Sequence, residues 1–308
     1  MKIIIILLIN FLFSQALTDI SFVSAKSFGL AGAIVSNPDN LESVFCNPAG
    51  VKHLDKKITI LSGRTQLYGL DFLEYQYLSV GFANNFAISY QQLGTSYKGP
   101  SDSYDDEFTD YGFNSFNGTL SREKAFTFSH GVSLLDDKNS KISFGYNLNY
   151  LKIFQNASAG PNGDGQNGLE AGEVESFGLD IGLLASLRDK VSFGVFVKNI
   201  NNPKISKGAS SSHLPRRLDL GITYYPFEQL TTTFAVERVL GSDESSFRFG
   251  VEYELSSSFL LRTGIQLNPN RYGAGFSYKI NNFELSYSIL THSVLPLTDV
   301  FNLKVYFD

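Results

Sequence analysis

Apolar and polar residues alternate along nearly all of the chain after Lys57. Segments of about ten residues with this period of two are separated by Gly, Asn, Asp, Ser and Pro, a pattern typical of β-strands joined by turns. Each segment is close to the length that a tilted membrane-spanning strand needs. The pattern predicts about fourteen strands, beginning near Ile58, Phe72, Phe86, Lys124, Lys141, Val174, Val191, Leu214, Leu230, Ser246, Phe259, Arg271, Phe283 and Asp299.

The two faces of these segments differ in character. Between Phe247 and Leu255, one face carries aromatic and aliphatic side chains, and the other carries Arg248, Gly250, Glu252 and Glu254. A water-soluble sandwich with one dry and one wet face would show the same alternation. The period alone therefore leaves a soluble sheet and a membrane barrel as alternatives.

The lengths of the connections favour the barrel. The connections after even-numbered segments are short, and all the long ones, such as 94–121 and 155–173, follow odd-numbered segments. One rim of short turns and one rim of long loops is the layout of an outer-membrane barrel. We therefore expect residues 57–308 to form a transmembrane antiparallel up-and-down β-barrel in the outer membrane of a Gram-negative-type bacterium. An even number of strands would leave both termini on the periplasmic, short-turn rim.

The first 56 residues do not follow this pattern. Residues 1–16 have a charged start at Lys2, an apolar stretch and a small-x-small site ending at Ala16, as secretory signal peptides do. An uncleaved anchor is the alternative, although the apolar run is shorter than the ~20 residues that span a bilayer. Residues 17–56 are predicted to form a segment inside the lumen. Its part from Ser24 to Val51 is rich in Gly, Ala, Asn and Pro and has no regular period.

Charged residues of both signs fall on the polar face of the predicted strands. We expect them to face the lumen and to pair between neighbouring strands, which would leave the lumen polar and partly filled. On a soluble sheet the same residues would face solvent. The predicted lumen charges are Arg217, Asp219, Glu237, Arg248, Glu252, Arg262, Lys279 and Glu284.

Composition and motifs narrow the chemistry further. The net charge of −5, without a Lys/Arg cluster, argues against nucleic acid as a partner. The only cysteine, Cys46, is expected to be a small buried residue, and the four histidines show no metal-ligand spacing. Acidic residues in 101–111 and the GPNGDGQNG stretch of 160–168 suit solvated loops, with calcium binding as an alternative. We predict no catalytic residues, metal or cofactor; a barrel hydrolase assembled by folding stays open as a distant alternative.

Two blocks of sequence carry a resemblance to a known family. The stretch from Ser24 to Ala33 and the stretch FCNPAGV from Phe45 to Val51 resemble the N-terminal signature of the FadL superfamily of outer-membrane barrels. Asn47, Pro48 and Ala49 look like the NPA motif of that superfamily. The run LPRR from Leu214, the run LGITY from Leu220 and the residues from Leu285 to Phe307 look like its PorV/PorQ branch.

The resemblance implies a fourteen-stranded barrel whose N-terminal segment folds inside as a hatch. The hatch motif would then comprise Gly29, Gly32, Asn47, Pro48, Ala49 and Gly50. PorV/PorQ proteins serve type IX secretion, so a non-enzymatic secretion-linked or surface-assembly component is the first hypothesis. The alternative is a FadL-like channel for long-chain fatty acids or other hydrophobic small molecules. Expected partners are outer-membrane lipid, with secretion-system proteins or exported cargo under the first hypothesis and a hydrophobic ligand under the second.

Overall fold

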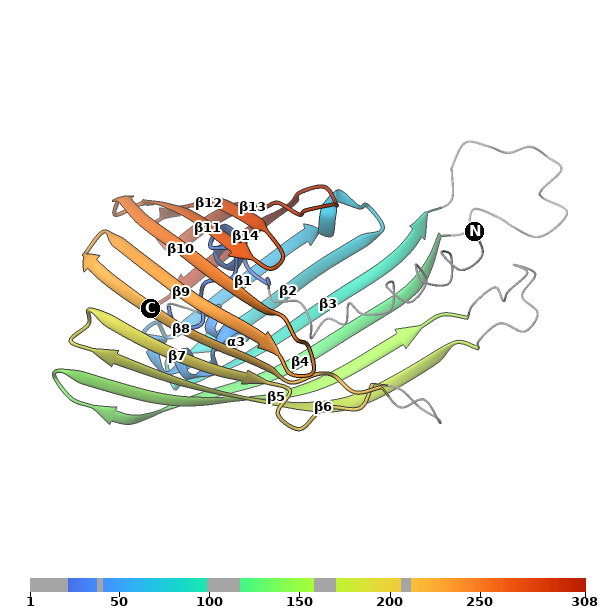
Figure 1. Ribbon diagram of the computed structural model, residues 1–308, viewed down its shortest axis with the longest axis horizontal. Coiled ribbons are helices and arrows are strands. Elements are labelled where there is room, and N and C mark those ends of the chain that lie inside the picture. The colour runs from blue at the N-terminus through green and yellow to red at the C-terminus, as the bar shows by residue number, and fades with distance from the viewer. Residues whose placement is uncertain (1–21, 38–40, 99–116, 158–169, 206–211) are drawn as a thin grey trace, which may run out of the picture.

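The structure is a closed, fourteen-stranded antiparallel β-barrel, which confirms the predicted fold class (Figure 1). The computed structural model describes residues 22–37, 41–98, 117–157, 170–205 and 212–308. Each strand pairs with its neighbours in sequence, and β14 pairs with β1 to close the ring. The strands are β1 Ile58–Gln66, β2 Leu73–Phe82, β3 Phe86–Lys98, β4 Asn117–Asp136, β5 Ser140–Gln155, β6 Gly172–Leu187, β7 Val191–Lys198, β8 Arg217–Phe227, β9 Leu230–Val239, β10 Ser245–Ser256, β11 Phe259–Leu267, β12 Arg271–Ile280, β13 Phe283–Leu290 and β14 Thr298–Phe307.

The predicted strand starts agree closely with the structure except at two places. Strand β4 begins at Asn117 rather than near Lys124. A bulge at Leu120, between Thr119, which pairs with Ser96, and Ser121, which pairs with Thr95, breaks the alternation on which the prediction relied. Strand β8 begins at Arg217 rather than at Leu214. Pro215 has no N–H to donate to a ladder, and Leu214 turns into the interior and is fully buried.

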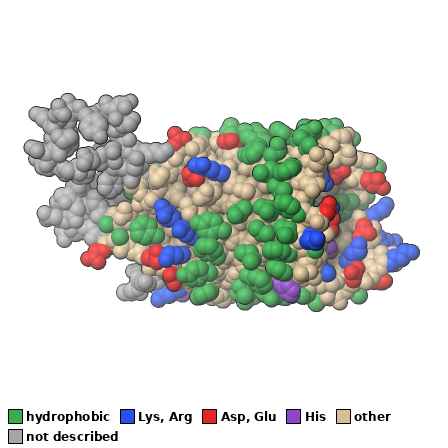
Figure 2. Space-filling model, turned by 180° about the vertical axis from the view of Figure 1, so that it is seen from behind, with side chains coloured by type: hydrophobic (Ala, Val, Ile, Leu, Met, Phe, Trp, Pro, Cys, Tyr) green, Lys and Arg blue, Asp and Glu red, His purple; other side chains and the backbone are tan. Residues whose placement is uncertain are grey.

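Side chains on the outer face of the wall are largely apolar. Phe126, Leu148, Phe234, Phe249, Phe276 and Phe301 are among those that point outward and are exposed. Figure 2 shows hydrophobic side chains gathered in a band across the face in view, with charged side chains on both sides of the band. Such a band is what the lipid-facing surface of a transmembrane barrel requires.

The wall is uneven in height. Strands β4, β5 and β6 contain 20, 16 and 16 residues, whereas β13 and β1 contain 8 and 9. We call β4 to β6 the long-strand wall and β11 to β14 with β1 the short-strand wall. Together with the neighbouring β3, the long-strand wall extends well past the rest of the barrel in Figure 1.

The two rims differ as expected. Short turns join β2 to β3, β4 to β5, β6 to β7, β8 to β9, β10 to β11 and β12 to β13, and the longer connections all lie on the opposite rim. The predicted signal peptide and the two loops considered for calcium fall outside the described residues. Among the described helices, none is long and apolar enough to cross a membrane.

Candidate functional site: the barrel interior and its N-terminal segment

Residues 22–37 and 41–54, here called the N-terminal segment, lie inside the ring of strands and are almost entirely buried. The segment contains helix α2 (Ala25–Gly29), helix α3 (Ser43–Cys46) and the 3-10 helix η2 (Pro48–His53). Ser24 and Ser27 form a capping box that starts α2. Pro48 occupies the first position of η2, where its missing N–H costs nothing.

Glycines on the inner face of the wall let the N-terminal segment approach closely. Gly131, Gly145 and Gly182 stand beside one another on β4, β5 and β6, and Gly250, Gly264 and Gly273 do so on β10, β11 and β12. A Cβ on Gly131 would lie 2.6 Å from the backbone nitrogen of Lys52, and one on Gly145 would collide with the backbone of Pro48 and Ala49. The wall therefore has recesses shaped to this segment.

Asn47 of the NPA sequence links the two parts of the segment to the wall. Its Nδ2 donates to the carbonyl oxygen of Val35 at 2.9 Å and to that of Leu183 on β6 at 3.1 Å. Its Oδ1 accepts a hydrogen bond from the N–H of Ala49. Asn47 is fully buried, so each of these bonds satisfies a polar group that water cannot reach.

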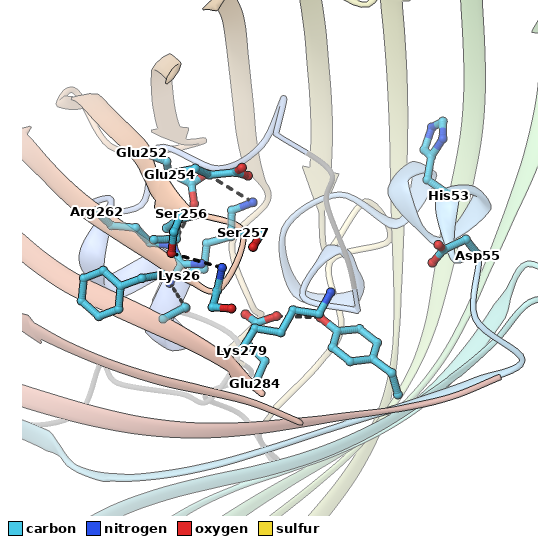
Figure 3. Close-up of a pocket in the computed structure, with 15 residues that line it drawn as sticks. Lys26, His53, Asp55, Glu252, Glu254, Ser256, Ser257, Arg262, Lys279 and Glu284 are labelled. Carbon is cyan, nitrogen blue, oxygen red and sulfur yellow. Dashed lines mark hydrogen bonds and ion pairs between the residues drawn. The ribbon is translucent and has the colours of Figure 1, made fainter. Parts of the chain in front are cut away.

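A buried carboxylate on β10 holds α2 in place. Glu252 accepts from Arg262 Nε on β11 at 2.8 Å and lies 3.4 Å from Lys26 Nζ of α2. Asn37 bridges the pair, because its Nδ2 donates to Glu252 and its Oδ1 accepts from Lys26. Figure 3 shows Lys26, Arg262 and Glu252 grouped on one side of the interior.

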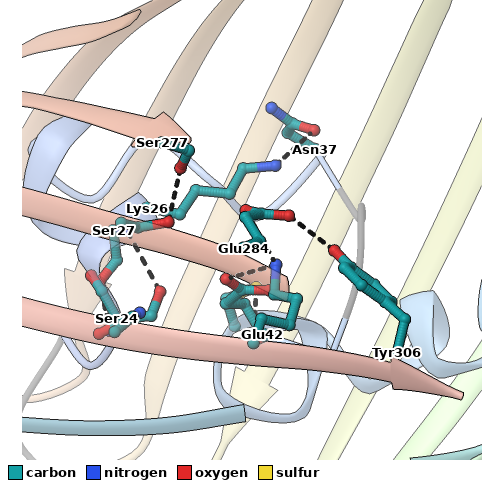
Figure 4. Close-up of polar contacts among 12 residues, drawn as sticks. Ser24, Lys26, Ser27, Asn37, Glu42, Ser277, Glu284 and Tyr306 are labelled. Carbon is teal, nitrogen blue, oxygen red and sulfur yellow. Dashed lines mark hydrogen bonds and ion pairs between the residues drawn. The ribbon is translucent and has the colours of Figure 1, made fainter. Parts of the chain in front are cut away.

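A second group of charges ties the segment to β14. Lys304 Nζ lies 3.1 Å from Glu42, which precedes α3, and 3.5 Å from Glu284 on β13. Tyr306 donates its hydroxyl to Glu284 at 2.7 Å. Glu42, Glu284 and Tyr306 converge in Figure 4 beneath Lys26 and Asn37.

A third group lies on β8, β9 and β10. Arg217 Nε is 3.2 Å from both Asp219 and Glu237, and Arg248 is 2.6 Å from Glu237. Arg248 also donates to the carbonyl oxygen of Gly32, which has a positive φ of 81°. Any side chain at Gly32 would press against the guanidinium as well as strain the backbone.

The N-terminal segment also contributes to an apolar cluster inside the barrel. Phe22, Phe28, Val44 and Phe45 pack there with buried wall residues such as Tyr75. Phe45 meets the ring of Tyr77 edge-on, with 5.4 Å between ring centroids. Leu214, from the β7–β8 connection, closes this cluster.

A pocket of about 410 Å³ opens beside the segment at the short-turn rim (Figure 3). His53 and Asp55 line one side, and Glu254, Lys279 and Glu284 are among the residues that line the other. Lys279 is exposed there, with its ammonium 5.2 Å from the centre of the Tyr306 ring. The lining is mostly polar and charged, which suits water or charged groups better than a hydrophobic molecule.

Cys46 is buried, as expected for a small structural residue. Burial raises the pKa of its thiol to about 12, so the thiol stays protonated. No group of three or more His, Cys, Asp or Glu side chains with metal-binding geometry occurs among the described residues.

All eight predicted lumen charges lie on the inner face, and seven of them belong to the three groups above. Lys279 instead lines the pocket at the rim. Sequence reasoning missed the charges that the N-terminal segment supplies, Lys26 and Glu42, and the recesses formed by wall glycines. Glycine recurring on the polar face of predicted strands was the available signal for those recesses.

Fold and interior define an outer-membrane β-barrel whose lumen is occupied by its own N-terminal segment. A family model described as type IX secretion system membrane protein PorP/SprF matches residues 45–294. The chain belongs to this PorP/SprF family.

Several solved structures have the same fold. The chain is similar to the CymD monoaromatic hydrocarbon channel, with a TM-score of 0.61 and 12% identity over 94% of this chain and 98% of that one. It is also similar to the Pseudomonas putida toluene transporter TodX (TM-score 0.60, 13% identity, 94% and 99% covered). A Pseudomonas aeruginosa FadL homologue matches with a TM-score of 0.54 and 12% identity, covering 93% and 98%. No curated protein matches.

Proposed function

We propose that this protein is a non-enzymatic outer-membrane component of type IX secretion whose lumen is kept closed by the N-terminal segment acting as a hatch. Membership of the PorP/SprF family supports the link to secretion. The main support for a closed lumen is that the segment is attached to opposite parts of the wall. Asn47 binds to β6, Lys26 pairs with β10, and Glu42 pairs with β14.

Residues 17–56 form the hatch in this proposal, and the NPA residues with Gly29, Gly32 and Gly50 shape it. Gly50 donates its N–H to the carbonyl oxygen of Asn47 and keeps the turn tight. The lumen charges Glu252, Arg248 and Glu284 hold the hatch or its neighbours by ion pairs and hydrogen bonds. Both termini would lie on the periplasmic rim.

The finer assignment to the PorV/PorQ branch stays a prediction, because the matching family is PorP/SprF. The secretion role itself does not depend on that branch. In either case we expect the partners to be secretion-system proteins or exported cargo, together with outer-membrane lipid.

A channel for hydrophobic molecules is the competing proposal. It draws support from the likeness in fold to CymD and TodX and from the apolar cluster around Phe28 and Phe45. The charged lining of the pocket at the short-turn rim argues against this channel, because a hydrophobic substrate would have to pass that lining.

Purification in a mild detergent followed by mass spectrometry separates the two proposals. We expect the barrel to carry no stoichiometric fatty acid or aromatic ligand and to co-purify with type IX secretion proteins. An unrelated outer-membrane barrel extracted from the same cells is the control for adventitious lipid and protein. A stoichiometric hydrophobic ligand without secretion proteins would replace the secretion proposal by the channel.

A further inference from the structure

The connection from β13 to β14, residues 291–297, exposes an unusual amount of apolar surface on the long-loop rim. Val294 is 86% exposed, Leu297 49% and Leu295 39%. Three large apolar side chains left together in water are unfavourable, because water orders around apolar surface that burial would remove. This loop belongs to the short-strand wall.

Hydrogen bonds within the turn hold these side chains in their exposed positions. His292 Nδ1 accepts hydrogen bonds from the N–H groups of Val294 and Leu295 at 3.2 and 2.9 Å. The His292 ring packs edge-on against Tyr68, at 5.1 Å between centroids, in the connection from β1 to β2. Tyr68 in turn donates its N–H to Thr298. Two neighbouring connections are thereby clamped together.

The same loop continues the lipid-facing surface. Thr291 donates its N–H to the carbonyl oxygen of Tyr272 and accepts from the Tyr272 N–H, both at 2.9 Å. Tyr272 is 61% exposed on the outer face of β12, and Leu267 at the end of β11 is 49% exposed. On this wall, apolar outward side chains therefore extend up to the turns themselves.

Strand length gives an independent argument. The 8 residues of β13, at about 3.3 Å each and tilted by about 40°, span about 20 Å, which is less than the apolar band of about 25 Å on such barrels. The 20 residues of β4 reach about 50 Å by the same arithmetic. Apolar loop residues just beyond β13 would complete the band that the strand leaves short.

We propose that residues 291–297 form a membrane-contacting edge, with Val294, Leu295 and Leu297 in contact with lipid acyl chains of the outer leaflet. The barrel then sits low in the bilayer along the short-strand wall and rises above it along the long-strand wall. This placement in the membrane does not depend on the secretion role. Asp299, next to the loop on β14, is exposed. In the alternative arrangement, lipid headgroups would meet the wall at Asp299, and Val294 would lie in water.

The chain contains no Trp, so single substitutions give clean fluorescence probes. The full-length protein would carry Val294→Trp, with Phe301→Trp on the apolar band as the lipid-exposed reference and Leu120→Trp at the far end of β4 as the water-exposed reference. Each variant is reconstituted into phosphatidylcholine vesicles with acyl chains brominated at mid-chain and then titrated with iodide. Heat-modifiable migration in gels confirms that each barrel is folded.

We expect brominated lipid to quench Val294→Trp by a fraction comparable to Phe301→Trp, while Leu120→Trp is quenched mainly by iodide. Val294→Trp quenched by iodide and not by brominated lipid would overturn the proposal. Protection from both quenchers would also overturn it, because a protein contact would then cover the loop. Leu297→Trp repeats the test at a second position if the first variant does not fold.

Discussion

The N-terminal segment meets the wall in two different ways. At β4, β5 and β6, wall glycines such as Gly145 admit the backbone around Pro48, and the hydrogen bonds there come from neutral amides. At β10 and β14, the segment meets Glu252 and Lys304 and supplies Lys26 and Glu42 in return. Both parts of the wall admit the segment at glycines, Gly145 on one and Gly264 on the other, but only the part around β10 and β14 also matches its charge.

The two kinds of contact should fail differently. A recess made by glycine excludes every other side chain, whatever its chemistry, because the clash is with backbone atoms. A buried ion pair depends on the charge of each partner, because a lone charge loses its hydration without compensation. A substitution that removes a charge but keeps the side-chain volume tests the ion pairs, and one that adds volume without charge tests the glycine recesses.

The largest effect is expected from Glu252→Gln. This change keeps the volume of the side chain but removes the anion that lies between the buried cations Lys26 and Arg262. Removing one member of a buried ion pair costs about 3–5 kcal/mol. Urea unfolding from vesicles, followed by heat-modifiable migration, measures the loss.

Glu74→Gln is the matched control for that variant. Glu74 pairs with Arg64 on the outer face of the wall, where Arg64 is 69% exposed, and such pairs contribute about 0.2–1 kcal/mol. Equal losses for the two variants would mean that the charges around Glu252 do not hold α2.

A smaller effect is expected from Gly145→Val. Its Cβ would meet the backbone of Pro48 and Ala49, and overpacking of this kind costs about 1–3 kcal/mol. Gly94→Val on β3 is the control, because a Cβ there meets no atom within 4 Å. Valine favours strands, so we expect the control to unfold at the same urea concentration as the parent or a higher one. If the Gly145→Val barrel were as stable as the Gly94→Val barrel, the recess at Gly145 would not be needed to admit the Pro48 backbone.

The strands could be predicted because each one shows the alternation of apolar and polar residues within its own sequence. In β10, Phe249, Val251 and Tyr253 alternate with Arg248, Glu252 and Glu254, and that period does not depend on the rest of the chain. The exceptions were local: a bulge near the start of β4 and Pro215 before β8. Both interrupt the alternation that the prediction relied on.

The contacts of the interior could be predicted only in part. The polar face of β10 identifies Glu252 as a lumen charge, but its distance to Lys26 depends on how an aperiodic segment folds 226 positions away in sequence. Lys26 itself stands between Ala25 and Ser27 with nothing local to indicate burial. Complementarity between the segment and the wall is a property of the closed barrel, which no short window of sequence contains.

The central claim is that the N-terminal segment closes the lumen, and single-channel conductance tests it most directly. The intact barrel and a variant lacking Ser24–Val51 would be inserted into planar bilayers after both are shown to be folded by heat-modifiable migration. We predict that the intact barrel stays closed and that the deletion variant produces sustained conductance steps. A folded deletion variant whose conductance equals that of the intact barrel would contradict the account.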